Sequence, residues 1–373
     1  MSDRRGAPIG PTFGAVSRRD LLVRGGLGFG MLGLADLLGC GQARAADPLL
    51  EPLAPKAPHF PAKAKRVVHV FLNGGPSQVD TFDPKPALAK YADGPAPVNL
   101  TTERKTGRPL PSPFAFARHG ESGLEIADIF PRIAAHADRL AVIRSMHAQV
   151  PNHEPSLMLM NCGDSVQPRP SVGSWILYGL GTENQNLPGF VAMCPGGHPV
   201  KGPDNWQSGF LPGSLQGTAI DSQHVEIGKL IENITSPHAT ATVQRHQLDW
   251  LSRMNAAHRE GRGDPRLDAR IHAFEMAFRM QAEAAEAFDV TRETAATRAL
   301  YGDTVHGRQT LIARRLLERG VRYVQVWHGA GQPWDNHEQI ESNHRTLAGQ
   351  IDQPVGALLS DLADRGMLDD TLV

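Results

Sequence analysis

The sequence has no excess of charge of either sign. It contains 38 Lys and Arg residues against 39 Asp and Glu residues, which gives a formal net charge of -1. Proteins that bind nucleic acid carry a basic patch that neutralises phosphates, and no basic stretch is visible here. We therefore exclude nucleic acid as a partner.

Long apolar runs and cysteines are also scarce. No stretch has the roughly 20 apolar residues of a membrane-spanning helix, so we expect no transmembrane segment once the leader described below is removed. Of the three cysteines, Cys40 lies in the leader, and Cys162 and Cys194 remain. Whether these two form a disulfide is left open, because pairing depends on the distance between their Cα atoms.

Residues 1–46 have the features of a twin-arginine (Tat) signal peptide. Arg18 and Arg19 precede a short glycine-rich apolar segment at 25–35, and Ala43-Arg44-Ala45 supplies the small residues of a cleavage site. We expect cleavage after residue 45 or 46 and a periplasmic or extracellular mature protein. Lipid anchoring at Cys40 is a minority alternative, because residues 37–40 also resemble a lipoprotein cleavage site.

A Pro- and Ala-rich linker at 47–64 is expected to lead into one large domain at 65–373. Residues 67–72 are nearly all apolar and rich in β-branched side chains, as in a strand that is covered on both faces. A helix that stops at an Arg-Gly pair and is followed by an apolar run occurs twice, at 316–326 and 362–373. This alternation predicts an α/β fold with a central, mostly parallel sheet flanked by helices.

Further elements are expected between these strands. We predict a helix over 124–137, a short strand over 140–143, and a helix that starts at Asp264-Pro265. In the last of these, Ile271, Phe274, Phe278 and Ala285 fall on one face, which we expect to pack against the core.

Polar side chains follow the first predicted strand. A Gly-Gly-Pro turn comes after Asn73, and Ser77, Asp80, Thr81 and Asp83 follow it. Open α/β sheets bind ligands outside the carboxyl ends of their strands. A binding site is expected there, although an ordinary turn would have the same composition.

Three candidate metal ligands follow the predicted strand at 321–326. They are His328, Asp335 and His337, and oxygen and imidazole ligands without nearby cysteine suit Zn, Mn or Fe. The alternative is a turn made by Asp335 and Asn336 with solvated histidines.

His153, Glu154 and Ser156 form a third polar group, at the predicted amino end of an apolar helix. Free amides and the helix dipole favour an anion at such a place, so a phosphate or sulfate ester is a possible ligand. The alternative is that Asn152 caps the helix and His153 is a bystander.

The chain resembles the exported bacterial DUF1501 proteins. The resemblance rests on segments 71–86, 142–147, 173–175, 178–190 and 321–326, in that order, and on the leader. It implies an alkaline-phosphatase-like fold, because the family is grouped with the alkaline phosphatase and sulfatase superfamily. Members of that superfamily hydrolyse phosphate or sulfate esters at a one-metal or two-metal site.

The resemblance also implies roles for individual residues. Asp335 and His337 correspond to metal ligands, and Asn73 stands where superfamily enzymes usually have Asp. No Cys-x-Pro-x-Arg motif accompanies the helix that starts at His153, which disfavours a formylglycine sulfatase. Ser77 and Ser156 remain as possible hydroxyl nucleophiles. Relatives continue beyond the equivalent of residue 373 with further ligands, so we expect this sequence to be truncated and the truncated chain to be inactive.

We therefore hypothesise that the full-length protein is an exported metal-dependent hydrolase that acts on a sulfated or phosphorylated small molecule or polysaccharide. Asp335, His337, His328 and Asn73 would bind a divalent ion, either Zn, Mn, Ca or Mg, and His153 and Ser77 would act in catalysis. The alternative is a non-catalytic exported binding or assembly module that retains the fold.

Overall fold

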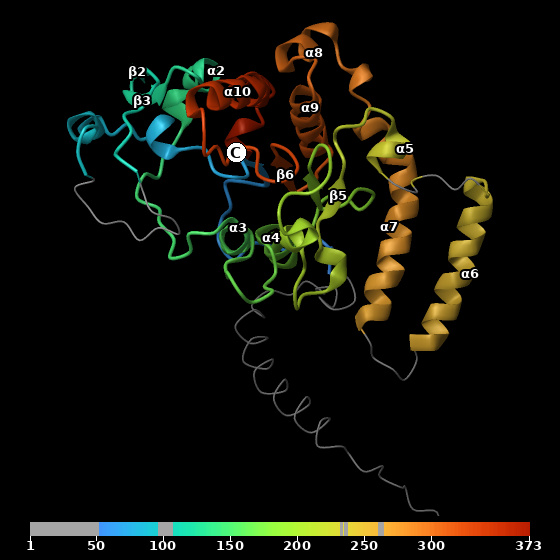
Figure 1. Cartoon of the computed structure of the whole chain (residues 1–373). Coiled ribbons are helices and arrows are strands. Elements are labelled where there is room, and N and C mark those ends of the chain that lie inside the picture. Colours follow the sequence, from blue (N-terminus) through green and yellow to red (C-terminus); the bar gives the residue numbers. More distant parts are fainter. Residues whose placement is uncertain (1–51, 96–106, 232–233, 235–237, 260–264) are drawn as a thin grey trace, which may run out of the picture. The chain divides into compact units, whose positions relative to one another are not determined.

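The computed structural model describes residues 52–95, 107–231, 234, 238–259 and 265–373. The predicted leader at 1–46, the start of the linker and Cys40 lie outside the described residues. Figure 1 shows the arrangement of the helices and strands.

A five-stranded sheet forms the centre of the molecule, with the order β5-β4-β6-β1-β7. Every neighbouring pair is parallel, which confirms the predicted α/β class. A separate antiparallel pair, β2 with β3, lies outside this sheet. The strands are β1 Arg66–Phe71, β2 Phe116–His119, β3 Leu124–Ala127, β4 Phe190–Met193, β5 Thr218–Ile220, β6 Tyr323–Trp327 and β7 Thr371–Leu372.

The helices alternate with these strands, as a parallel sheet requires. The α-helices are α2 Pro131–Ala134, α3 His153–Cys162, α4 Val172–Leu180, α5 Ile227–Leu230, α6 Ala241–Arg259, α7 Pro265–Ala287, α8 Ala295–Tyr301, α9 Val305–Glu318 and α10 Ile340–Asp364. The short 3-10 helices are η1 Gln78–Asp80, η2 Pro86–Tyr91, η3 Ala137–Arg139, η4 Gly202–Trp206, η5 Gly213–Leu215, η6 Val290–Arg292 and η7 Leu368–Asp370.

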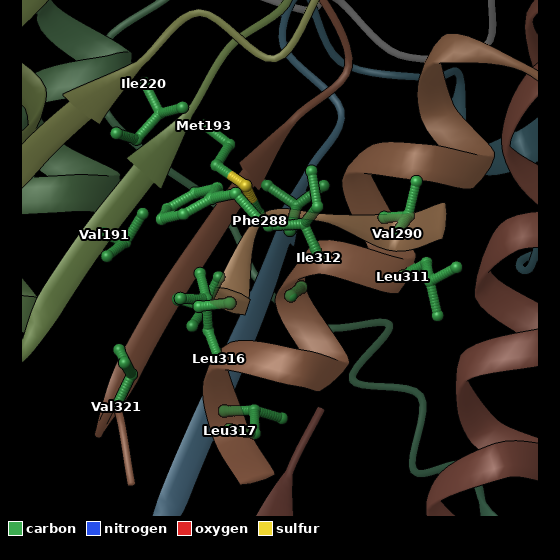
Figure 2. Close-up of a cluster of buried hydrophobic side chains, with 14 of the residues drawn as sticks. Val191, Met193, Ile220, Phe288, Val290, Leu311, Ile312, Leu316, Leu317 and Val321 are labelled. Carbon is green, nitrogen blue, oxygen red and sulfur yellow. The ribbon is translucent and has the colours of Figure 1, made fainter. Parts of the chain in front are cut away.

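Both faces of the sheet are covered, because successive side chains of a strand point to opposite sides. On β6, Val324 and Val326 belong to the cluster that contains Leu311, Ile312 and Leu316 of α9. Figure 2 shows this cluster between the strands and α9. The alternate residues Tyr323 and Trp327 belong to the cluster that contains Leu157 of α3 and Leu177 of α4.

Three expectations from the sequence are wrong. Residues 124–137 are not one helix, because residues 124–127 pair with β2 as strand β3 and α2 starts only at Pro131. Residues 140–143 form no strand, and Ile143 is exposed. The places beside β1 in the sheet are taken by β6 and β7, so this segment has no partner there.

The third error concerns α7. The helix starts at Pro265 as predicted, but Phe274 and Ala285 are exposed. The residues of α7 that enter the core are Met280, Ala284 and Ala287. The predicted apolar stripe is therefore not the face of α7 that packs against the core, because that face is formed by Met280, Ala284 and Ala287.

The described residues bear on the cysteines, which were left open, and on the expectation of no transmembrane segment. Cys162 and Cys194 are both buried and both free, so they do not form a disulfide. No described helix combines the length and the apolar character needed to span a bilayer.

Candidate functional site

The Asn73 turn and the Asp335 turn lie side by side at the carboxyl edge of the sheet. β1 and β6 are neighbours in register, with Phe71 opposite Trp327, so the chain leaves both strands at the same edge. The backbone N–H of Trp334 donates to the carbonyl oxygen of Asn73 at 3.1 Å. Gly74 permits this approach, because a Cβ atom there would lie 2.5 Å from the backbone nitrogen of Asp335.

Asp335 brings two predicted site histidines together. His153 Nε2 lies 3.2 Å from Asp335 Oδ2, and His337 Nε2 lies 2.8 Å from Asp335 Oδ1. His153 is the first residue of α3, so a helix amino end meets the loop after β6 at this carboxylate. All three side chains are partly exposed, which leaves them accessible to a ligand.

The donor atoms of this cluster suit a divalent ion. Around a tetrahedral zinc with bonds of about 2.1 Å, neighbouring ligand atoms lie about 3.4 Å apart, close to the two separations above. The histidines contact the carboxylate directly, however, and the described residues contain no group of three or more His, Cys, Asp or Glu arranged as a metal site. An ion would therefore have to separate Asp335 from its two partners.

Asn73 lies fully buried beside this cluster. Its amide nitrogen donates to the carbonyl oxygens of Gly329 at 2.8 Å and Gly331 at 2.6 Å, which ties the two loops together. Its Oδ1 atom is buried without a hydrogen-bond partner among the described residues. A buried oxygen without a partner is unfavourable, so Asn73 Oδ1 is an available neutral acceptor or ligand.

His328 uses both ring nitrogens in hydrogen bonds. The indole N–H of Trp334 donates to Nδ1 at 2.9 Å, which places the proton on Nε2, and Nε2 then donates to Gln350 Oε1 at 2.9 Å. Burial lowers the pKa of His328 to about 4, although the bond to Gln350 opposes this shift. In this arrangement the neutral His328 ring positions Trp334. To bind an ion, His328 would have to give up one of its two hydrogen bonds.

Ser77 is linked to the same loop through His344. Its backbone N–H donates to His344 Nε2 at 3.1 Å, and the other ring nitrogen of His344 contacts Asn336 Oδ1 at 2.9 Å. The Ser77 hydroxyl donates to Asp80 Oδ2 at 2.6 Å. The hydroxyl thus has a carboxylate acceptor within reach, as a nucleophile needs.

The other polar residues at the start of α3 have local roles. The Ser156 hydroxyl donates to the carbonyl oxygen of Val150 at 3.0 Å. Asn152 occupies the N-cap position, but its side chain forms no capping hydrogen bond. The first amides of α3 are therefore not satisfied by this side chain.

A buried amide network fixes α3 on the sheet. Gln325, in the middle of β6, donates to Asn161 Oδ1 of α3 at 2.7 Å. Asn161 in turn donates to Asn205 Oδ1 at 3.3 Å. All three residues are 2% exposed or less. Because a hydrogen bond in a dry interior is directional, this network sets the position of α3 and hence of His153.

These site residues all lie within residues 64–373, which match a family described as "Protein of unknown function (DUF1501)". The chain belongs to the DUF1501 family. No curated protein and no solved structure matches it significantly. The DUF1501 description names no activity, so any function has to be argued from the site.

Sequence reasoning missed two residues of this candidate site, His344 and Gln350. Both lie on α10, after the Asp335 loop. His344 is 1% exposed, and burial lowers its pKa, while the Asp80 charge opposes that shift. Neither residue lies at a predicted strand end or at the start of a predicted helix, so only the packing of α10 brings them to the site.

Proposed function

We propose that this protein is an exported, metal-dependent hydrolase of sulfate or phosphate esters with an alkaline-phosphatase-like fold. The observation that carries the proposal is the meeting of His153, Asp335 and His337 at the carboxyl edge of a parallel sheet. Ligands of open α/β sheets bind at that edge. Export through the twin-arginine route would place the enzyme in the periplasm or outside the cell.

Asp335 and His337 would hold a divalent ion, with Asn73 Oδ1 as a neutral oxygen ligand. When bound, such an ion polarises the ester and offsets the charge that develops on its oxygens. His328 belongs to the same proposal, either as a ligand after a change in its hydrogen bonds or as the support of Trp334. The identity of the ion stays open among Zn, Mn, Ca and Mg.

His153 and Ser77 would perform the proton transfer and the attack. Ser77 Oγ would form a bond to phosphorus or sulfur while the bond to the leaving oxygen breaks. The Ser77 proton would pass to Asp80 Oδ2, its hydrogen-bond acceptor, and the leaving oxygen would take a proton from Nε2 of protonated His153. Water would then attack the Ser77 ester and give a proton to His153, while the bond to Ser77 Oγ breaks and Asp80 returns its proton to Ser77. The substrate would be a sulfated or phosphorylated small molecule or polysaccharide.

Ester turnover by the purified protein tests this proposal. The protein is loaded separately with each of the four metals and assayed with p-nitrophenyl phosphate and p-nitrophenyl sulfate. His153→Ala and Ser77→Ala should each lower kcat by about a hundredfold or more. Ser342→Ala is the control, because Ser342 is exposed and its hydroxyl donates only locally, to the carbonyl oxygen of Gln339. Undiminished turnover in both site variants would refute the assignment.

A second candidate function is a non-catalytic binding or assembly module. It is favoured by the two hydrogen bonds that occupy His328, and by the direct contacts of Asp335 with both histidines. The same assay separates the two functions. A protein that binds the metals but turns over neither ester would support the module.

A further inference from the structure

Helix α6 has an apolar stripe on the side that does not face its neighbour. Val243, Trp250 and Met254 follow each other at spacings of seven and four residues, which keeps them on one face of the helix. Their exposed fractions are 46%, 67% and 54%. No residue of α6 belongs to the three buried core clusters of the described chain.

On its inner side, which faces α7, α6 is held by ion pairs. Arg245 donates to Asp249 on the same helix and to both carboxylate oxygens of Glu275 on α7. Asp249 is the only acidic residue of α6, which also contains three arginines. The carboxylates of Asp249 and Glu275 are therefore paired with Arg245, on the side of α6 that faces α7.

The outer side of α6 is apolar and cationic. At 3.6 residues per turn, Arg253 lies about 60° around the helix from Trp250, and His246 lies about 60° from Val243 on the same flank. Arg253 is exposed and has no ion pair among the described residues. The acid nearest to this side, Asp249, lies about 40° beyond Arg253 and is paired with Arg245. The combination of an apolar stripe with Trp and an exposed Arg on its flank is typical of a helix that lies on a membrane surface.

We propose that the outer face of α6, defined by Val243, Trp250, Met254 and Arg253, binds the surface of an anionic lipid bilayer. Trp side chains are favoured at the boundary between headgroups and acyl chains, where the ring is buried and the indole N–H stays hydrated. Arg253 would contact lipid phosphates. A second copy of the chain fits this face less well, because the acid nearest to Arg253, Asp249, is already paired with Arg245, so Arg253 gains no free opposite charge from a second such face.

Vesicle flotation of the full chain tests this docking. The probes are vesicles of phosphatidylglycerol mixed with phosphatidylcholine, and vesicles of phosphatidylcholine alone. Trp250→Ser with Met254→Ser should lower the bound fraction on anionic vesicles by about tenfold, because the two large apolar contacts are lost. Arg253→Glu should lower binding to the anionic vesicles by about tenfold and leave binding to phosphatidylcholine unchanged.

The matched control is Trp175→Ser, which removes another exposed tryptophan, on α4, and should not change binding. All variants keep residues 1–51, so any lipid binding by that segment is equal in every sample. Because the substituted side chains are exposed, melting temperatures should agree with that of the unsubstituted chain.

A complementary measurement places Trp250 directly. Trp206, Trp327 and Trp334 are buried, so in a Trp175→Phe background Trp250 is the one strongly exposed tryptophan, and bromine-labelled lipids should quench its fluorescence. Equal flotation of the Trp250 and Met254 variant, or no quenching, would overturn the proposal. So would a dimer in sedimentation that Trp250→Ser dissolves without any effect on lipid binding, because the face would then be an interface between copies.

Discussion

At the scale of single residues, the site depends on a close approach of two loops. Gly74 has a φ of +95° and lies against the backbone of residues 332–335, and Gly75 beside it has a φ of +77° but open space around it. Both positions favour glycine for their backbone conformation. Only Gly74 is also required by the contact between the loops.

This difference predicts the effects of two alanine substitutions. Gly74→Ala should lower the free energy of unfolding by about 3 kcal/mol or more, because backbone strain adds to a clash with backbone atoms that cannot rotate away. Gly75→Ala is the matched control and should cost about 1 kcal/mol from backbone strain alone. Urea unfolding of both variants measures the difference, and equal losses would contradict the close approach.

At the scale of elements, the site depends on where α3 sits on the sheet. His153 starts this helix, and Asn161, two turns later, is hydrogen-bonded to Gln325 of β6. A buried polar residue in the middle of a parallel strand is unusual, since such strands are mostly apolar. The hydrogen bond between Asn161 and Gln325 thus fixes the position of α3 on the sheet more than it adds to net stability.

A double-mutant cycle tests this pair. Asn161→Leu should lower the free energy of unfolding by about 1–3 kcal/mol, because the Gln325 amide is left buried without its acceptor. Asn161→Leu with Gln325→Leu should recover part of that loss, because the Gln325 amide is removed as well, while Asn205 Oδ1 loses its Asn161 donor in both variants. Strictly additive losses in urea unfolding would show that the two amides are not coupled.

The sequence predicted those elements whose local signals agreed with their packing. The strand at 67–72, the helix start at Pro265 and the strand at 321–326 carried both a pattern and a boundary residue, and the structure has an element at each. Residues 124–137 had a helical pattern, yet Gly123, with a φ of +63°, reverses the chain so that Leu124 pairs with β2. Pairing with the preceding strand in a hairpin overrode the helical preference there.

The sequence likewise predicted some of the site residues but not the contacts among them. A shared location at strand ends pointed to Asn73, Asp335 and His337, and the register of β1 and β6 places their loops together. The position of His328 at a strand end did not indicate that both of its ring nitrogens would form hydrogen bonds, one with Trp334 and one with Gln350. Hydrogen bonds between side chains from distant elements leave no periodic trace in a sequence.

At the scale of the whole molecule, several histidines are buried as neutral rings. Burial lowers the pKa of His69 and of His328 to about 4, and it also lowers the pKa values of His306 and His344. In the unfolded chain these rings titrate near about 6.5. Below that pH the unfolded state binds protons that the folded state does not.

Stability should therefore fall as the pH is lowered from about 6.5 toward about 4, by up to about 1.4 kcal/mol per pH unit for each such histidine. His306→Phe keeps a ring against His328, whose centroid is 4.5 Å away, and should make the fall less steep. Ser342→Ala, which changes no titratable group at an exposed position, should not change the slope. Urea unfolding across this pH range checks the slopes, and a stability that rises toward pH 4 would contradict the buried neutral state.

The most direct test of the metal site is the metal content of the purified protein, measured by mass spectrometry after dialysis against each candidate metal. Asp335 is the carboxylate that joins both histidines, and Asp221, which lies 3.6 Å from His224, provides a matched pair after β5. We predict at least one tightly held divalent ion per chain, lost in Asp335→Ala and retained in Asp221→Ala. Unchanged metal content in Asp335→Ala, or no bound ion in the unsubstituted protein, would contradict the account.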